Sequence, residues 1–142
     1  MITENGKRKI ALFLKEFYTK GNVGVGGDAT NPNGNVLDSP MLADASMVTM
    51  SNSTSGNTTI DFKGSFTGSQ LTGTTIREFG VFGDLPLDAT FENMKLEGVA
   101  QETTDGTEAT TEQIMLARVN FDGLGPFAAT DQVDFILTVE VE

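Results

Sequence analysis

The sequence predicts a mainly β protein: an antiparallel β-sandwich or barrel-like domain with one N-terminal amphipathic helix. Three observations lead to this prediction. An apolar stripe of helical period lies near the N-terminus, later segments alternate apolar and polar residues, and glycine-rich turns separate those segments. The 142 residues can bury one core and show no boundary or repeat, so we expect a single domain over residues 1–142.

The helix is predicted over residues 4–20. Thr3 is a suitable N-cap, and Gly21 is a suitable left-handed stop. Leu12 lies on the polar side of this helix, either as an ordinary exposed leucine or as a second contact to a neighbouring subunit. Four apolar residues form a stripe that we expect to be buried against the sheet or a neighbour: Ile10, Phe13, Leu14 and Phe17.

The β domain is predicted over residues 22–142. It begins with a short strand at 22–25. A loop rich in Gly, Pro and Asn follows, from 26 to about 40, because these residues favour turns. We expect Met41 and Leu42 to anchor the end of the loop to the core.

Period-two alternation begins after this loop. Residues 58–67, TTIDFKGSFT, place Ile and Phe on one face and polar side chains on the other, which predicts a half-buried strand. Residues 47–50 are its expected partner, across a turn at 51–57. A second turn is expected at 68–73, before another strand at 74–83.

The second half of the chain is predicted to hold three more strands. Gly80 indicates a bulge or a close backbone approach. Residues 84–113 are expected to form an inserted hairpin, with a weak strand at 91–101 and an exposed polar tip at 103–113. A strand is predicted at 114–121, and the last one at 132–142 alternates regularly except at Ile136.

Composition argues against several classes of function. The chain lacks His and Cys, so structural zinc sites, iron–sulfur clusters and disulfides are excluded. Its net charge is −11 and its one basic cluster is residues 7–9, so we expect no nucleic-acid partner. The apolar run at 10–14 is too short for a signal peptide, and no segment has the length of a membrane span, so we expect no membrane partner.

One loose cluster of oxygen ligands is a weak calcium candidate. Its spacing does not match an EF-hand and the terminal bidentate Glu is missing, so a solvated turn is the favoured interpretation. We expect no cofactor. The members of this cluster are Asp28, Asn31, Asn33, Asn35 and Asp38.

The carboxylates do not predict an enzyme. They lie in expected loops or on a solvent-facing strand, where charge runs are usually solvated. No nucleophile has a visible activating base, although a Ser–Lys arrangement stays open. We therefore expect a non-enzymatic protein. The neighbouring pairs are Asp84 and Asp88, Asp105 and Glu108, and Glu140 and Glu142.

Residues 75–83, TIREFGVFG, contain a motif seen in small structural proteins of tailed viruses. The chain resembles these proteins, which include the N-terminal domain of tail-collar fibre proteins. Residues 115–118 match the family's later A-R strand, and 84–113 depart from it because the family connects the two strands quickly. Four residues occupy positions of the pattern I-x-E-x-G-hydrophobic-F: Ile76, Glu78, Gly80 and Phe82.

The resemblance implies a virion structural protein that is assembled in the host cytoplasm. It would be a tail-tip, baseplate or capsid accessory subunit, forming a symmetric homo-oligomer and contacting other virion proteins. An alternative is a displayed module that binds a host glycan or surface protein through loops 26–40 and 103–113. Aromatic platforms for sugars are scarce, since Tyr18 is the only tyrosine and tryptophan is absent.

Several residues are predicted at subunit contacts. The helix stripe and Leu12 would dock on the particle. Ile136 breaks a polar face, so we expect an apolar partner to cover it within a closed oligomer. Glu78 is expected to pair with Arg77 or Arg118 inside the core, with a role in subunit geometry as the second interpretation.

Overall fold

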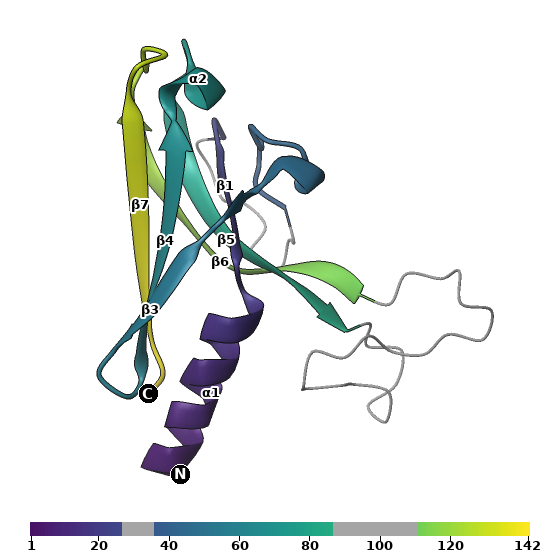
Figure 1. The fold of residues 1–142 in the computed structure, drawn as a ribbon, viewed down its shortest axis with the longest axis vertical. Coiled ribbons are helices and arrows are strands. Elements are labelled where there is room, and N and C mark those ends of the chain that lie inside the picture. The colour runs from purple at the N-terminus through teal and green to yellow at the C-terminus, as the bar shows by residue number, and fades with distance from the viewer. Residues whose placement is uncertain (27–35, 87–110) are drawn as a thin grey trace, which may run out of the picture.

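The computed structural model describes residues 1–26, 36–86 and 111–142 (Figure 1). The described chain is mainly β. Two antiparallel sheets, ordered β2-β1-β5-β6 and β3-β4-β7, pack face to face, and an N-terminal helix lies beside them. Neither of these sheets closes into a barrel. The predicted fold class is therefore confirmed as a β-sandwich-like domain with one N-terminal helix.

Helix α1 spans Glu4–Phe17. The predicted cap is confirmed, because the Gly6 N–H donates to Thr3 Oγ1 at 3.0 Å. The predicted end is wrong: the helix stops before Tyr18, and Lys20 and Gly21 already pair with neighbouring strands on both sides. Sheet pairing therefore ends the helix, and the glycine stop is not used.

The first sheet contains β1 (Lys20–Gly24), β2 (Val48–Thr49), β5 (Ile76–Pro86) and β6 (Thr111–Leu124). The long β5–β6 pair includes both predicted strands and extends beyond them. Residues 84–86 and 111–113, expected in the inserted hairpin, continue this pair, and the predicted polar tip is wrong at 111–113. The expected strand at 91–101 and the rest of the tip lie outside the described residues.

The second sheet contains β3 (Ser51–Ser55), β4 (Thr59–Thr67) and β7 (Gln132–Glu140). The predicted turn at 51–57 is wrong in its first part, because β3 occupies it and pairs with β4. The expected partner 47–50 contributes β2 to the other sheet. Strand β3 is a polar edge strand with mostly exposed side chains, so it has no apolar alternation to detect.

Two short helices complete the described chain. A single 3₁₀ turn, η1, spans Asp44–Ser46. The second, α2 (Gly68–Leu71), lies where a turn was predicted. Thr67 and Gln70 form a capping box at its start, in which the Gln70 side chain accepts the Thr67 N–H at 2.9 Å.

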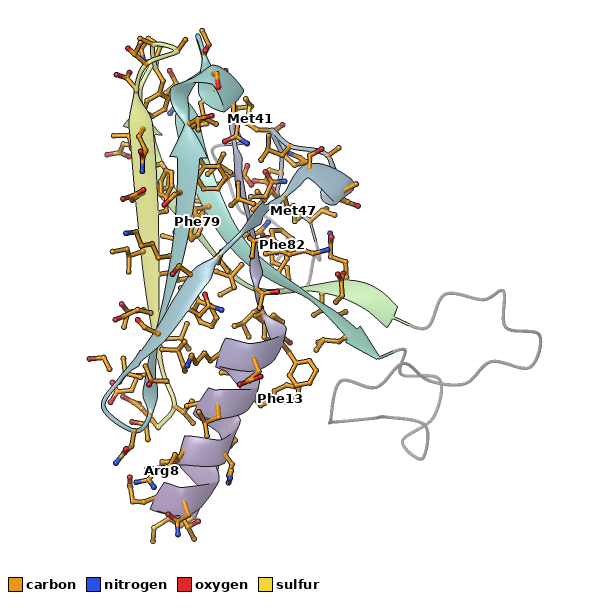
Figure 2. All side chains as sticks on the ribbon, viewed as in Figure 1. Arg8, Phe13, Met41, Met47, Phe79 and Phe82 are labelled. Carbon is orange, nitrogen blue, oxygen red and sulfur yellow. The ribbon has the colours of Figure 1, made fainter. Side chains whose placement is uncertain are left out.

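The main core lies between the two sheets. Inward side chains of β4 meet those of β5, and Phe66 contacts Phe79 edge to face at a centroid distance of 6.3 Å. Figure 2 shows Phe79 directed toward the second sheet and Phe82 on the other side of β5. The apolar side chains buried in the main core are Ala11, Tyr18, Val23, Met50, Ile60, Phe62, Phe66, Leu71, Ile76, Phe79 and Val81.

Helix α1 packs on this core through three of the four expected stripe residues, Phe13, Leu14 and Phe17, together with Ala11, which was not expected. Ala11 is fully buried and Leu14 packs beside it, whereas Ile10 is 39% exposed and contributes nothing to the core. Phe13 and Phe17 stack at a ring-centroid distance of 4.6 Å and are half-buried against the core. The small side chain of Ala11 lets the helix approach the strands closely, so the contact centres there.

We predict that Ala11→Leu destabilises the protein by about 1–3 kcal/mol, because added methyl groups have no space at a fully buried position. Ala45→Leu makes the same change at an exposed position and should stay within about 0.5 kcal/mol of the wild type. Urea unfolding followed by circular dichroism measures both. Equal stabilities would contradict the close helix packing.

We also predict an elevated pKa for the phenol of Tyr18, because burial raises it above its ordinary value of 10.0. The pKa is higher in the folded chain, so the stability from this group is complete below pH 10.0 and is lost as the pH rises through the folded-state pKa. Tyr18 is the only tyrosine and tryptophan is absent, so phenolate absorbance reports this group alone. If the phenolate absorbance titrated with a midpoint of 10.0 both with and without urea, the prediction would be contradicted.

Candidate functional site

The residues predicted at subunit contacts do not gather in one place. The helix stripe and Leu12 lie on α1, where Ile10 and Leu12 are 39% and 38% exposed. Glu78 lies inside the protomer on β5, and Ile136 lies on β7 of the other sheet. Two local arrangements follow, one around Glu78 and one along β7.

Glu78 fixes the loop of residues 36–42, which we call the 36–42 loop, onto the outer face of the first sheet. Its side chain is fully buried, and its carboxylate oxygens accept the N–H groups of Asp38 at 2.8 Å and Ser39 at 3.2 Å. Gly24 and Gly26 make room for it, since a Cβ at either position would collide with the Glu78 side chain. The buried charge therefore has two backbone donors in its own chain.

The two arginines considered as partners of Glu78 both reach other groups. Arg77 donates to the carbonyl oxygen of Asp122 at 2.8 Å. Arg118 crosses to the loop that Glu78 holds, where its Nη1 lies 3.5 Å from Asp38 Oδ1. Sequence reasoning did not identify the backbone of residues 38–39 as the partner of Glu78, because a backbone donor leaves no mark in the side-chain pattern.

Asn22 holds the same loop a few residues later. Its Nδ2 donates to the Leu42 carbonyl at 2.9 Å, and its Oδ1 accepts the Leu42 N–H at 3.2 Å. The expected apolar anchors, Met41 and Leu42, are half-buried and pack against the core as predicted, and Leu37 is also buried, at 2% exposed. Gly80 makes room beneath it, because a Cβ there would lie 2.9 Å from Leu37. A close backbone approach was expected at Gly80, and the group that approaches its Cα is instead the Leu37 side chain.

Strands β6 and β7 form one side of the sandwich, which we call the open side because no described strand pairs with the outer edge of either. Each of these strands is the last in its sheet, and they face each other through Phe121 and Phe135, stacked at 5.7 Å. The inward residues of β7 are only half-buried, whereas Ile60, Phe62 and Phe66 on neighbouring β4 are fully buried.

On the outer face of β7, the apolar residue Ile136 lies between polar contacts. Lys63 Nζ lies 3.6 Å from Asp134 Oδ2, and Thr138 Oγ1 donates to Asp61 at 2.7 Å. Hydrogen bonds from Ser65 and Gln132, and then the Lys63 charge, lower the pKa of Asp134. Ile136, between these contacts, is 63% exposed.

The calcium candidate is represented by Asp38 alone, since Asp28, Asn31, Asn33 and Asn35 lie outside the described residues. Asp38 faces Arg118, as described above. Asp84 forms an ion pair with Lys20 at 2.6 Å, while Asp88, Asp105 and Glu108 also lie outside. Within residues 1–26, 36–86 and 111–142, no three acidic residues are grouped to hold a metal ion.

Comparisons with known proteins give no match: no protein-family model matches the chain, and no curated protein sequence resembles it significantly. In the described part of the chain, no helix has the length and apolar character needed to cross a membrane.

We predict that Glu78→Gln destabilises the protein by about 1–3 kcal/mol, because an amide nitrogen cannot accept the N–H that one carboxylate oxygen now accepts. Hydrogen exchange at the Asp38 and Ser39 amides should accelerate. Glu16→Gln, at an exposed position on α1, is the matched control and should leave both readouts unchanged. Equal behaviour of the two variants would show that the buried carboxylate does not hold the loop.

Proposed function

We propose that this chain is a non-enzymatic structural subunit of a tailed-virus particle, assembling as a symmetric homo-oligomer. Its place would be a tail tip, a baseplate or the capsid exterior, in contact with other virion proteins. The observation that supports this proposal most is the open side of the sandwich, where half-buried apolar side chains lie beside strand edges that no strand of the described residues pairs with.

A free strand edge is a template for pairing with another chain. Soluble monomers usually protect such edges with Lys, Pro, bulges or very short strands. Strand β7 is nine residues long, contains no Lys, Arg or Pro, and pairs with β4 in an unbroken register. A closed symmetric assembly would cover this edge and limit uncontrolled strand addition.

The residues that carry the family resemblance support a structural role. Ile76, Glu78, Gly80 and Phe82 are all buried in β5, where they pack against the core or hold the 36–42 loop. The two buried polar side chains of the described chain, Asn22 and Glu78, both make their hydrogen bonds with backbone groups. Each therefore fixes one part of the chain to another.

Native mass spectrometry of the purified protein tests self-assembly, and peptide mass spectrometry of purified virus particles from the source tests location. We expect a native mass of at least twice the 15.1 kDa of one chain, and this chain among the particle proteins. Particles without the chain would contradict the proposal. Glycan-array binding by a monomeric protein would favour the displayed host-binding module instead.

A further inference from the structure

We propose that two copies of this chain pair through their β7 strands, antiparallel, about a two-fold axis at Ile136. The two three-stranded sheets would then form one continuous sheet across the dimer. This inference rests on the proposed function and specifies the contact by which the copies assemble.

Among the sheet edges of the described chain, β7 is the best suited to strand addition. Strand β2 has two residues, and β3 has five that are mostly exposed and polar. Strand β6 carries two register shifts against β5, which bend an edge and disturb further pairing. Strand β7 is long and its register is regular.

The backbone of β7 shows which groups face outward. The Val141 N–H donates to the Thr58 carbonyl at 2.9 Å, so residue 141 directs its backbone groups toward β4. Backbone groups in a strand alternate in direction, and the unbroken register carries this alternation along β7. The residues whose N–H and C=O groups point to the free edge are therefore Gln132, Asp134, Ile136, Thr138 and Glu140.

Ile136 is the middle residue of these five, so a two-fold axis there pairs all of them with their counterparts. Gln132 then faces Glu140 of the second copy, and Asp134 faces Thr138 of the second copy. No two carboxylates are opposed, which matters because like charges directly across a pair are destabilising.

Neighbouring registers are less favourable. Sliding one strand by two residues sets Asp134 opposite Glu140 of the second copy, which opposes two carboxylates. Sliding it the other way sets exposed Ile136 opposite Asp134 of the second copy and leaves Glu140 without a partner among the five. The sequence of β7 is thus self-complementary about Ile136 alone.

The same register covers the half-buried inner face of β7. Phe135 would lie opposite Leu137 of the second copy, and Val133 opposite Val139 of the second copy. These would be non-hydrogen-bonded pairs, the type in which facing Cα atoms come closest, at about 4.5 Å. On the outer face, the two Ile136 side chains would cover each other within the polar contacts of Asp134 and Thr138.

Sedimentation velocity over a concentration series tests this contact. We expect a dimer for the wild type and a monomer for Ile136→Lys, which places two cations on the axis. Gln132→Glu opposes a second carboxylate to Glu140 at two places in the dimer, so the dissociation constant should rise about tenfold. Circular dichroism should show all variants folded, because these side chains are exposed.

A charge swap tests the register. Gln132→Glu with Glu140→Gln keeps the net charge at −11 and restores complementary pairs, so its dissociation constant should return to within about threefold of the wild type. Asn5→Asp adds one negative charge at an exposed position on α1 and should leave the dissociation constant unchanged. No rescue by the swap would overturn the register.

The outcomes separate this inference from the proposed function. An oligomer whose mass is unaffected by Ile136→Lys and Gln132→Glu would overturn the β7 contact and leave self-assembly standing. A wild type that stays monomeric at every concentration would overturn the β7 contact and the self-assembly. Particle mass spectrometry would then decide the virion role separately.

Discussion

Contacts of the Phe135 ring connect the described strands across the sandwich. Phe135 stacks on Phe79 at 5.1 Å and on Phe121 at 5.7 Å, and meets Phe66 edge to face at 5.9 Å. One side chain on an edge strand thus contacts β4, β5 and β6, and it remains only half-buried. The Phe135 ring therefore contacts strands of both sheets although the chain does not cover it fully. The same side chain therefore contributes to the packing of the core and to the half-buried apolar face of the open side.

The outer face of the first sheet is covered by the 36–42 loop, which polar side chains hold in place. Strand β5 is buried on both faces over much of its length, because the main core covers one face and the 36–42 loop covers the other. A loop can be held against a sheet only if its backbone groups find partners. Glu78 and Asn22 provide these partners, and Leu37 adds an apolar contact beneath the loop. These two buried polar side chains add to the backbone hydrogen bonds that join the loop to Val23 and Val25.

The distribution of charge is compatible with assembly despite a net charge of −11. On the outer face of β7 the two acidic side chains, Asp134 and Glu140, are separated by uncharged Ile136 and Thr138, and Asp134 forms an ion pair with Lys63 of β4. Most repulsion between copies would then act over longer distances, where salt screens it. An edge contact can therefore form while the remaining acidic surface keeps assemblies soluble.

The mainly β class, the N-cap at Thr3 and the strands β4 and β7 could be predicted from the sequence, because caps and two-residue alternation are local properties. The sequence also singled out Ile136 as an unexplained apolar residue on a polar face, and the structure places that residue in solvent. Three features emerge from the folded chain and not from its sequence: β3 pairs with β4, Ala11 faces the core, and Glu78 binds the backbone of residues 38–39. Each of these depends on residues far apart in the chain, and small or backbone partners leave no periodic pattern.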